Sequence, residues 1–401
     1  MRRVAVMCDG ITNKRAINDR PYKEYVYPHR AAPLFTPPKR ASLFQLVSQQ
    51  KGNINLELRE LIPAVAGLMS ITGYETYDAA GLTPLVQGFD EDYIDRVGNR
   101  ILVRRCGRAN APKILIDTHY DEIGMYVTEI KENGFLTVTS VGGLDARTLP
   151  SAEVKIYGKE VIDGVIGSVP PHLKSLSNAE EVKPVDELLI DTGYPTEELK
   201  ELLRIGTPVG FAPKYLTLQE NRIVGKGLDN KACAAVAIHA LRDIPAAELA
   251  GDVYLVLSVH EETDREGGTV VGGYAVEPDY AMVIDVNIGH APGSKKSETV
   301  SMSKGPSLCR SAITDRRLTA MTEALCDRLE IPWQRCVEPT STGTNTVALH
   351  LVGKGIPVVD VGLPLRAMHT YVEALDMTDA EQLAALVRAF VCDKEIGEVF
   401  A

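Results

Sequence analysis

The fold of this chain is decided by the stretch VYLVLSVHEETDREGGTVVGGYAVEPDYAMVID, residues 253–285. It begins with a nearly continuous apolar run of strand length, VYLVLSV (253–259), and ends with a second one, YAMVID (280–285). The segment between them passes through a Gly-Gly region and is long enough for a helix. A strand, a helix and a second strand in this order predict two parallel strands of one sheet. The helix returns the chain to the end of the sheet at which the first strand began, so the second strand runs in the same direction.

The same alternation extends to both sides of this unit. KILID (113–117) predicts another buried strand. Further strands are expected at 101–105, 332–337 and 356–362, and helices at 58–71, 230–243, 314–330, 344–351 and 378–392. The predicted fold class is therefore α/β, with a mostly parallel sheet flanked by helices on both faces.

The sequence between residues 128 and 222 has a different texture. Short alternating segments such as FLTVTSV (135–141) and VIDGVIG (161–167) are separated by glycines, which is typical of an all-β module, and one helix-prone stretch interrupts them. We expect an inserted β-rich domain here. The expected organisation is an N-terminal extension at 1–54, a first part of the main domain at 55–127, the insertion at 128–222, and a second part at 223–401.

Composition excludes several classes of protein. The net charge is -11, which argues against a nucleic-acid partner, although residues 1–50 are locally basic, with nine Lys/Arg against three Asp/Glu. No apolar run reaches the roughly 18 residues that a membrane-spanning helix needs. The seven cysteines are scattered and odd in number, which favours reduced thiols and a cytoplasmic location.

Five potential metal ligands lie next to these predicted elements: His119, Asp229, Glu262, Asp285 and His369. Taken singly, each has an ordinary interpretation as a turn, cap or core residue. Taken together, they follow strands or begin a helix, and the carboxyl ends of parallel strands meet at one edge of a sheet. Two histidines and three carboxylates at one edge predict a two-metal hydrolase site.

The roles within this predicted site follow from position. Asp229, beside glycines at a helix start, is the candidate for bridging two ions, with His119 and Asp285 on one ion and Glu262 and His369 on the other. Glu261 directly precedes Glu262 after a buried strand, where two unpaired charges would be costly, so we expect it to be the general base. Asp121, two residues after His119, is expected to orient the imidazole.

At this point the ordered motifs resemble the tetrahedral aminopeptidase family, the glutamyl- and leucyl-type co-catalytic metallopeptidases. The similarity runs from about residue 58 to about 392 and is carried by THYDEIGMYV (118–127), VGGLDARTLP (141–150), GVIGSVPPHL (164–173), GKGLDNKA (225–232), VHEET (259–263), PDYAMVIDV (278–286) and MHTYVE (368–373). The resemblance implies an inserted domain used in assembly, a homo-oligomeric dodecamer that trims peptides from the N-terminus, and the same ligand and base positions.

The position of the insertion separates this family from the carboxypeptidase and deacylase branch, in which the extra domain precedes the last histidine. Here the long gap of 110 residues lies between His119 and Asp229, whereas Asp285 and His369 are 84 residues apart. Three positions depart from the family pattern: Asn230 and Asn345 replace acids, and Asp264 replaces a glycine.

Two alternatives to a two-metal aminopeptidase stay open. One is an amidohydrolase or deacylase that acts on a small N-acyl or amide metabolite, and the other is a metal-binding assembly protein without turnover. The expected cofactors are two divalent ions per subunit, zinc or cobalt first and manganese next, because imidazole and carboxylate ligands suit all three.

Overall fold

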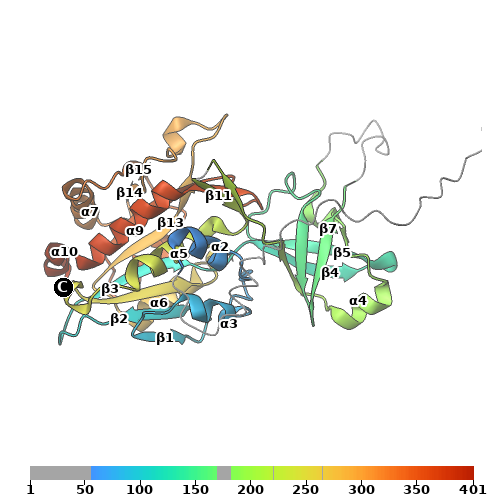
Figure 1. Ribbon diagram of the computed structural model, residues 1–401, viewed down its shortest axis with the longest axis horizontal. Helices are drawn as coiled ribbons and strands as arrows, with labels where there is room; N and C mark the ends of the chain where they lie inside the picture. Colours follow the sequence, from blue (N-terminus) through green and yellow to red (C-terminus); the bar gives the residue numbers. More distant parts are fainter. Residues whose placement is uncertain (1–55, 169–181, 220, 264) are drawn as a thin grey trace, which may run out of the picture. The chain divides into compact units, whose positions relative to one another are not determined.

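The computed structural model describes residues 56–168, 182–219, 221–263 and 265–401 (Figure 1). The expected N-terminal extension at 1–54 lies outside the described residues, as does Asp264. Among the helices that are described, none combines the length and the apolar character that crossing a membrane requires.

The main domain is built on a sheet of 11 strands among the described residues. Its centre is parallel and consists of β12 (Asp252–Ser258), β3 (Lys113–His119), β13 (Tyr280–Ile288) and β16 (Val358–Arg366). Its margins are antiparallel, with β1 (Glu91–Ile94) and β2 (Arg100–Arg104) beside β12, and β17 (Glu373–Asp376), β11 (Arg222–Gly225) and β10 (Leu216–Leu218) beyond β16. The α/β class is confirmed, with the parallel strands concentrated where the expected strand–helix units lie.

Alternation of side chains along these strands feeds two cores. Ile114 and Ile116 of β3 belong to a large cluster on one face, and Leu115 belongs to a smaller cluster on the other. The larger core is covered by α2 (Leu58–Ala66), α5 (Leu228–Leu241), α7 (Arg316–Arg328) and α9 (Met377–Cys392), and also takes in residues of α3 (Ala79–Leu82) and α10 (Lys394–Phe400). The smaller core is covered by α6 (Gly267–Val276) and α8 (Thr346–Leu349). Helices therefore cover both faces, as the alternation predicts.

The predicted β-rich insertion is a closed antiparallel barrel with the order β4-β5-β8-β7-β6-β9. Its strands are β4 (Gly124–Ile130), β5 (Phe135–Val141), β6 (Glu153–Tyr157), β7 (Val161–Ile166), β8 (Ile190–Asp191) and β9 (Pro208–Phe211). It encloses its own core, which includes Leu199 of the predicted interrupting helix, α4 (Thr196–Leu202). Closure leaves no open sheet edge among the described residues of this barrel.

Some helices and strands begin or end at other residues than the sequence predicts. The helix expected over 58–71 ends at Ala66 and is followed by Gly67. The strand expected over 280–285 continues to Ile288, because β16 pairs with it along that whole length. No strand was expected at β14 (Ser307–Ser311), which pairs with both β15 (Gln334–Glu338) and β16.

Candidate metal centre

The five potential ligands and Glu261 line one cavity of about 910 Å³. His119 is the last residue of β3, and Glu261 and Glu262 begin the short helix η6 (Glu261–Thr263) just after β12. Asp285 lies within β13, but β13 pairs with β3 only through Val283. Continuing this register places Asp285 level with His119 at the end of β3, and both side chains line the cavity. The structure thus brings all six side chains together.

Asp229 lies between the two histidines. Its Oδ1 is 3.2 Å from Nε2 of His119, and its Oδ2 is 3.4 Å from Nε2 of His369. The same Nε2 atom of His119 is 3.7 Å from Oδ1 of Asp285, whereas that of His369 is 3.6 Å from Oε2 of Glu262. The side chains therefore divide into two groups, each with one imidazole and one carboxylate, that share Asp229.

The other ring nitrogen of each histidine faces a backbone carbonyl. Nδ1 of His119 is 3.0 Å from the carbonyl oxygen of Asp121, and Nδ1 of His369 is 3.1 Å from that of Gly143, in the loop after β5. A carbonyl only accepts, so in each neutral imidazole Nδ1 carries the proton and Nε2 presents its lone pair to the cavity. A histidine in this tautomer can bind a metal ion through Nε2, while its Nδ1–H is held by the carbonyl.

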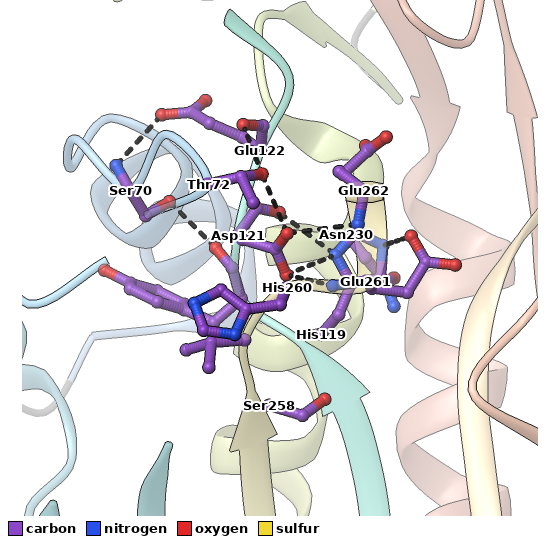
Figure 2. A network of polar contacts seen from close by, with 12 residues as sticks. Ser70, Thr72, His119, Asp121, Glu122, Asn230, Ser258, His260, Glu261 and Glu262 are labelled. Carbon is purple, nitrogen blue, oxygen red and sulfur yellow. Dashed lines mark hydrogen bonds and ion pairs between the residues drawn. The ribbon is translucent and has the colours of Figure 1, made fainter. Parts of the chain in front are cut away.

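The carboxylate of Asp121 does not hydrogen-bond the imidazole as expected; its Oδ1 lies 3.6 Å from Nδ1 of His119. It instead accepts from the backbone N–H groups of Glu261 and Glu262, each at 3.1 Å, and from the hydroxyl of Thr72 at 2.9 Å (Figure 2). Asp121 therefore fixes the turn that carries the two glutamates, while its carbonyl orients His119.

The electrostatics of the cavity are unbalanced. Burial raises the pKa of Glu262 to about 9 and that of Glu261 to about 7, and the negative charge of Asp229 adds to both shifts. Burial also raises the pKa of Asp285 well above its usual range. Burial alone would lower the pKa of His119, but the charges of Glu261 and Asp285 hold it well above the ordinary value. A cation bound among these carboxylates would favour their ionised forms, so the raised pKa values indicate a cation site.

A possible metal site is visible in the geometry. One potential ligand atom each from His119, Asp229 and Glu262 lies within 4.8 Å of the others. Nitrogen and carboxylate oxygen at such spacing suit a divalent transition metal ion.

Sequence reasoning missed Glu373, although it is the last letter of the motif MHTYVE. Its Oε2 accepts from the backbone N–H groups of Leu228 and Asp229, at 2.7 and 3.1 Å, and its Oε1 accepts from that of His369 at 3.0 Å. One buried side chain thus fixes the backbone of two potential ligands. Only the pairing of β17 with β11 brings it there.

Two residues that depart from the family pattern lie behind the cavity and do not line it. The amide of Asn230 donates to the carbonyl of Ile284 at 2.9 Å and to the hydroxyl of Thr118 at 3.1 Å. The amide of Asn345 donates to Asp117 at 2.6 Å and to Ser258 at 2.8 Å. These asparagines therefore serve as hydrogen-bond donors that join buried strand ends.

This sheet with its inserted barrel matches the solved structures of TET aminopeptidases. The sequence model of the M42 glutamyl aminopeptidases matches residues 98–386, so the chain belongs to that family and is a peptide hydrolase. It is 30% identical to the lysyl aminopeptidase of Pyrococcus furiosus over 83% of this chain and 96% of that protein.

Solved structures agree with this assignment. An aminopeptidase from the archaeon Desulfurococcus kamchatkensis superposes with a TM-score of 0.78 at 29% identity, covering 86% of this chain and 97% of that one. The TET1 peptidase of Pyrococcus horikoshii gives a TM-score of 0.73 at 28% identity, covering 84% and 99%.

Proposed function

We propose that this protein is a two-metal aminopeptidase that removes residues from the free N-terminus of peptides. The observation that carries the proposal is the position of Asp229, whose two oxygens each face the Nε2 atom of a different histidine. A carboxylate placed in this way suits a bridge between two ions.

The residues fit two divalent ions. Asp229, Glu261, Glu262 and Asp285 bring four carboxylates to a cavity whose described lining residues include two imidazoles, those of His119 and His369. His119 and Asp285 would hold one ion, Glu262 and His369 the other, and Asp229 would bridge them. When bound, such ions polarise a scissile carbonyl and make the attacking water more acidic. Zinc or cobalt is the expected occupant, with manganese also compatible with the ligands.

Glu261 is proposed to move the proton. Burial raises the pKa of its carboxyl to about 7, which is close to the optimum for a group that must both accept and release a proton at neutral pH. Glu261 is held next to Glu262 by the hydrogen bonds that their N–H groups donate to Asp121. We propose that it takes the proton of the water and then gives it to the leaving amine.

Assembly is proposed by analogy with solved relatives. The TET1 peptidase of Pyrococcus horikoshii is described as a dodecamer and as forming a tetrahedron or a large octahedral shell. We propose that this chain also forms a homo-oligomer, with the inserted barrel taking part in the contacts. The six cysteines of the described residues are free, which suits the reducing cytoplasm as its location.

Hydrolysis of a panel of free and N-blocked aminoacyl substrates tests the proposal, with bound metal quantified before and after chelation. We expect cleavage only when the amino terminus is free, about two ions per chain, and loss of activity on chelation that added metal reverses. Cleavage of blocked substrates alone would assign the protein to deacylation instead. A metal-loaded protein that cleaves neither kind would assign it to assembly without turnover.

A further inference from the structure

The cavity contains more negative charge than the candidate metal centre uses. Besides Asp229, Glu261, Glu262 and Asp285, it is lined by Glu266, Glu338 and Asp360. Among the described residues that line it, none is a lysine or an arginine. Two divalent ions carry four positive charges, which balance the first four carboxylates. Glu338 and Asp360 add negative charge to this cavity beyond the four carboxylates that the ions balance.

Strand alternation places Glu338 on the cavity side. Ser311 of β14 is opposite Glu338 of β15, and Cys309 is opposite Cys336, two residues earlier on each strand. Side chains two residues apart share a face, so Cys309 and Glu338 both reach the cavity, as its lining confirms.

The arginines of the same two strands alternate to the other face. Arg310 of β14 and Arg335 of β15 both pair there with Glu323 of α7, and the Arg335 contact is 3.1 Å long. Their positive charges are therefore neutralised away from the cavity. Among the ion pairs of the described residues, none includes Glu338.

Asp360 adds a second acid on the strand next to β14, and Glu338 and Asp360 together form what we call the acidic floor of the cavity. Asp360 lies on β16 directly opposite Cys309, and its side chain is 5% exposed. Its Oδ2 accepts from the hydroxyls of Thr344 and Thr346, at 2.6 and 2.7 Å. Burial raises the pKa of Asp360, and the nearby charge of Glu338 adds to the shift. A cation placed between these two carboxylates would offset both the burial of Asp360 and its repulsion by Glu338.

We propose that this floor, formed by Glu338 and Asp360, receives the side chain of the substrate's first residue, and that it selects lysine and arginine. The inference rests on the proposed aminopeptidase function and names its substrate class. A long aliphatic stem can pass the thiol of Cys309 while its charged end reaches the carboxylates, where charge-assisted hydrogen bonds are strong. A glutamyl side chain would meet only like charge there. Glu338 is the specificity-determining residue, since Asp360 already holds two hydroxyls.

The same carboxylates could instead bind the α-ammonium group, which every aminopeptidase substrate carries. The two possibilities predict different results. A site for the α-ammonium group affects all substrates equally, whereas a site for the side chain affects only those with a basic first residue. Lysyl and norleucyl substrates separate the two, because both have unbranched side chains and only one carries the terminal charge.

The experiment uses the metal-loaded, full-length protein and p-nitroanilides of lysine, arginine, norleucine and glutamate. We expect kcat/KM for lysyl and arginyl substrates to exceed that for norleucyl by about tenfold or more, with glutamyl cleaved most slowly. In Glu338→Gln the ratio of lysyl to norleucyl kcat/KM should fall about tenfold, mainly through KM. Glu338→Lys should raise the ratio of glutamyl to lysyl hydrolysis. Glu381→Gln, on the exposed side of α9, removes one acidic charge elsewhere and should leave the ratios as in the wild type.

Hydrolysis of the norleucyl substrate shows that each variant is folded. The inference fails, and the proposed function stands, if the wild type cleaves norleucyl as well as lysyl substrates. It also fails if Glu338→Gln lowers both by the same factor. If the metal-loaded wild type cleaves no substrate with a free amino group, the proposed function fails and the inference fails with it.

Discussion

Two buried clusters of charge lie within a few residues of each other and are built in opposite ways. Glu122 accepts from Nζ of Lys226 at 2.8 Å and pairs with Lys231 at 2.9 Å, so the protein supplies its own cations. Asp229, Glu262 and Asp285 instead share a cavity with two imidazoles and no lysine or arginine among the described lining residues. Burial tends to raise the pKa of every one of these acids. Two lysines bring the pKa of Glu122 below its usual value, and the two histidines do the same for Asp229, whereas the pKa values of Glu262 and Asp285 stay raised.

The difference separates a structural cluster from a binding site. A buried charge is tolerated when it is paired, and removing one partner is costly. The cluster around Glu122 is complete within the chain and ties the residue after Asp121 to the start of α5. The acids of the cavity are left for cations that come from outside. Four experiments test this difference, and they follow in order of decreasing expected effect.

The largest effect is expected for Glu261→Gln. If Glu261 moves the proton, this variant should lose kcat by about 10³-fold, because general acid–base catalysis contributes on that scale. Bound metal should stay near the wild-type amount, since Glu261 is not one of the proposed ligands. Activity assays with parallel metal analysis check this, and Glu381→Gln is the matched control. Hydrolysis at a near wild-type rate would remove Glu261 from the mechanism.

The next effect is on stability in the metal-free state. Glu122→Gln should lower the free energy of unfolding by about 3 kcal/mol, because it leaves the charges of Lys226 and Lys231 buried without a carboxylate. Asp285→Asn should cost little or should stabilise, because it removes a buried acid whose neighbours include Glu261 and Asp229. Urea unfolding in a chelating buffer measures both variants. If both variants lost the same free energy of unfolding, the two clusters would not differ in the way described.

A smaller effect is expected at the loop that orients His369. A Cβ added at Gly143 would lie 2.8 Å from Nδ1 of His369, so Gly143→Ala should displace the imidazole that its carbonyl orients. Disturbing such a partner typically weakens metal affinity about tenfold or more. Titration with zinc against a competing chelator checks this. Gly167→Ala, where an added Cβ would make only ordinary contact, is the control, and equal affinities would show that the loop does not position His369.

The smallest effect is a pH dependence. Burial opposes ionisation of Glu122, but its two lysines lower the pKa below the ordinary 4.5. The stabilisation from this carboxylate is therefore complete above about pH 4.5 and is lost as the pH falls through the folded-state pKa. The difference in unfolding free energy between wild type and Glu122→Gln, both metal-free, should narrow from pH 5 to pH 3. A difference that stays constant would mean that Glu122 has the same pKa in the folded and the unfolded protein, so that its two lysines do not lower it.

Much of the fold was predictable because its signals are local. Apolar runs at 113–117 and 253–259 match β3 and β12 within one or two residues at each end. The texture of 128–222 predicted a β-rich insertion, although the barrel strands begin at Gly124 and end at Phe211, and β10 belongs to the large sheet. The strand at 280–285 was predicted too short, because its extension to Ile288 depends on β16, whose residues follow some 70 positions later. β14 was missed for a related reason, since it is defined by its pairing with β15 and β16.

The types of side chain that meet at the cavity could be read from the sequence, because hydropathy places the strand ends and the residues after them carry the candidate ligands. Which atoms face one another depends on the folded arrangement. The carbonyl of Gly143 against His369, the carboxylate of Glu373 beneath Asp229, and Glu338 on the cavity face all join residues distant in the chain. Such contacts depend on strand register and on how loops return, and no local pattern of residues encodes them.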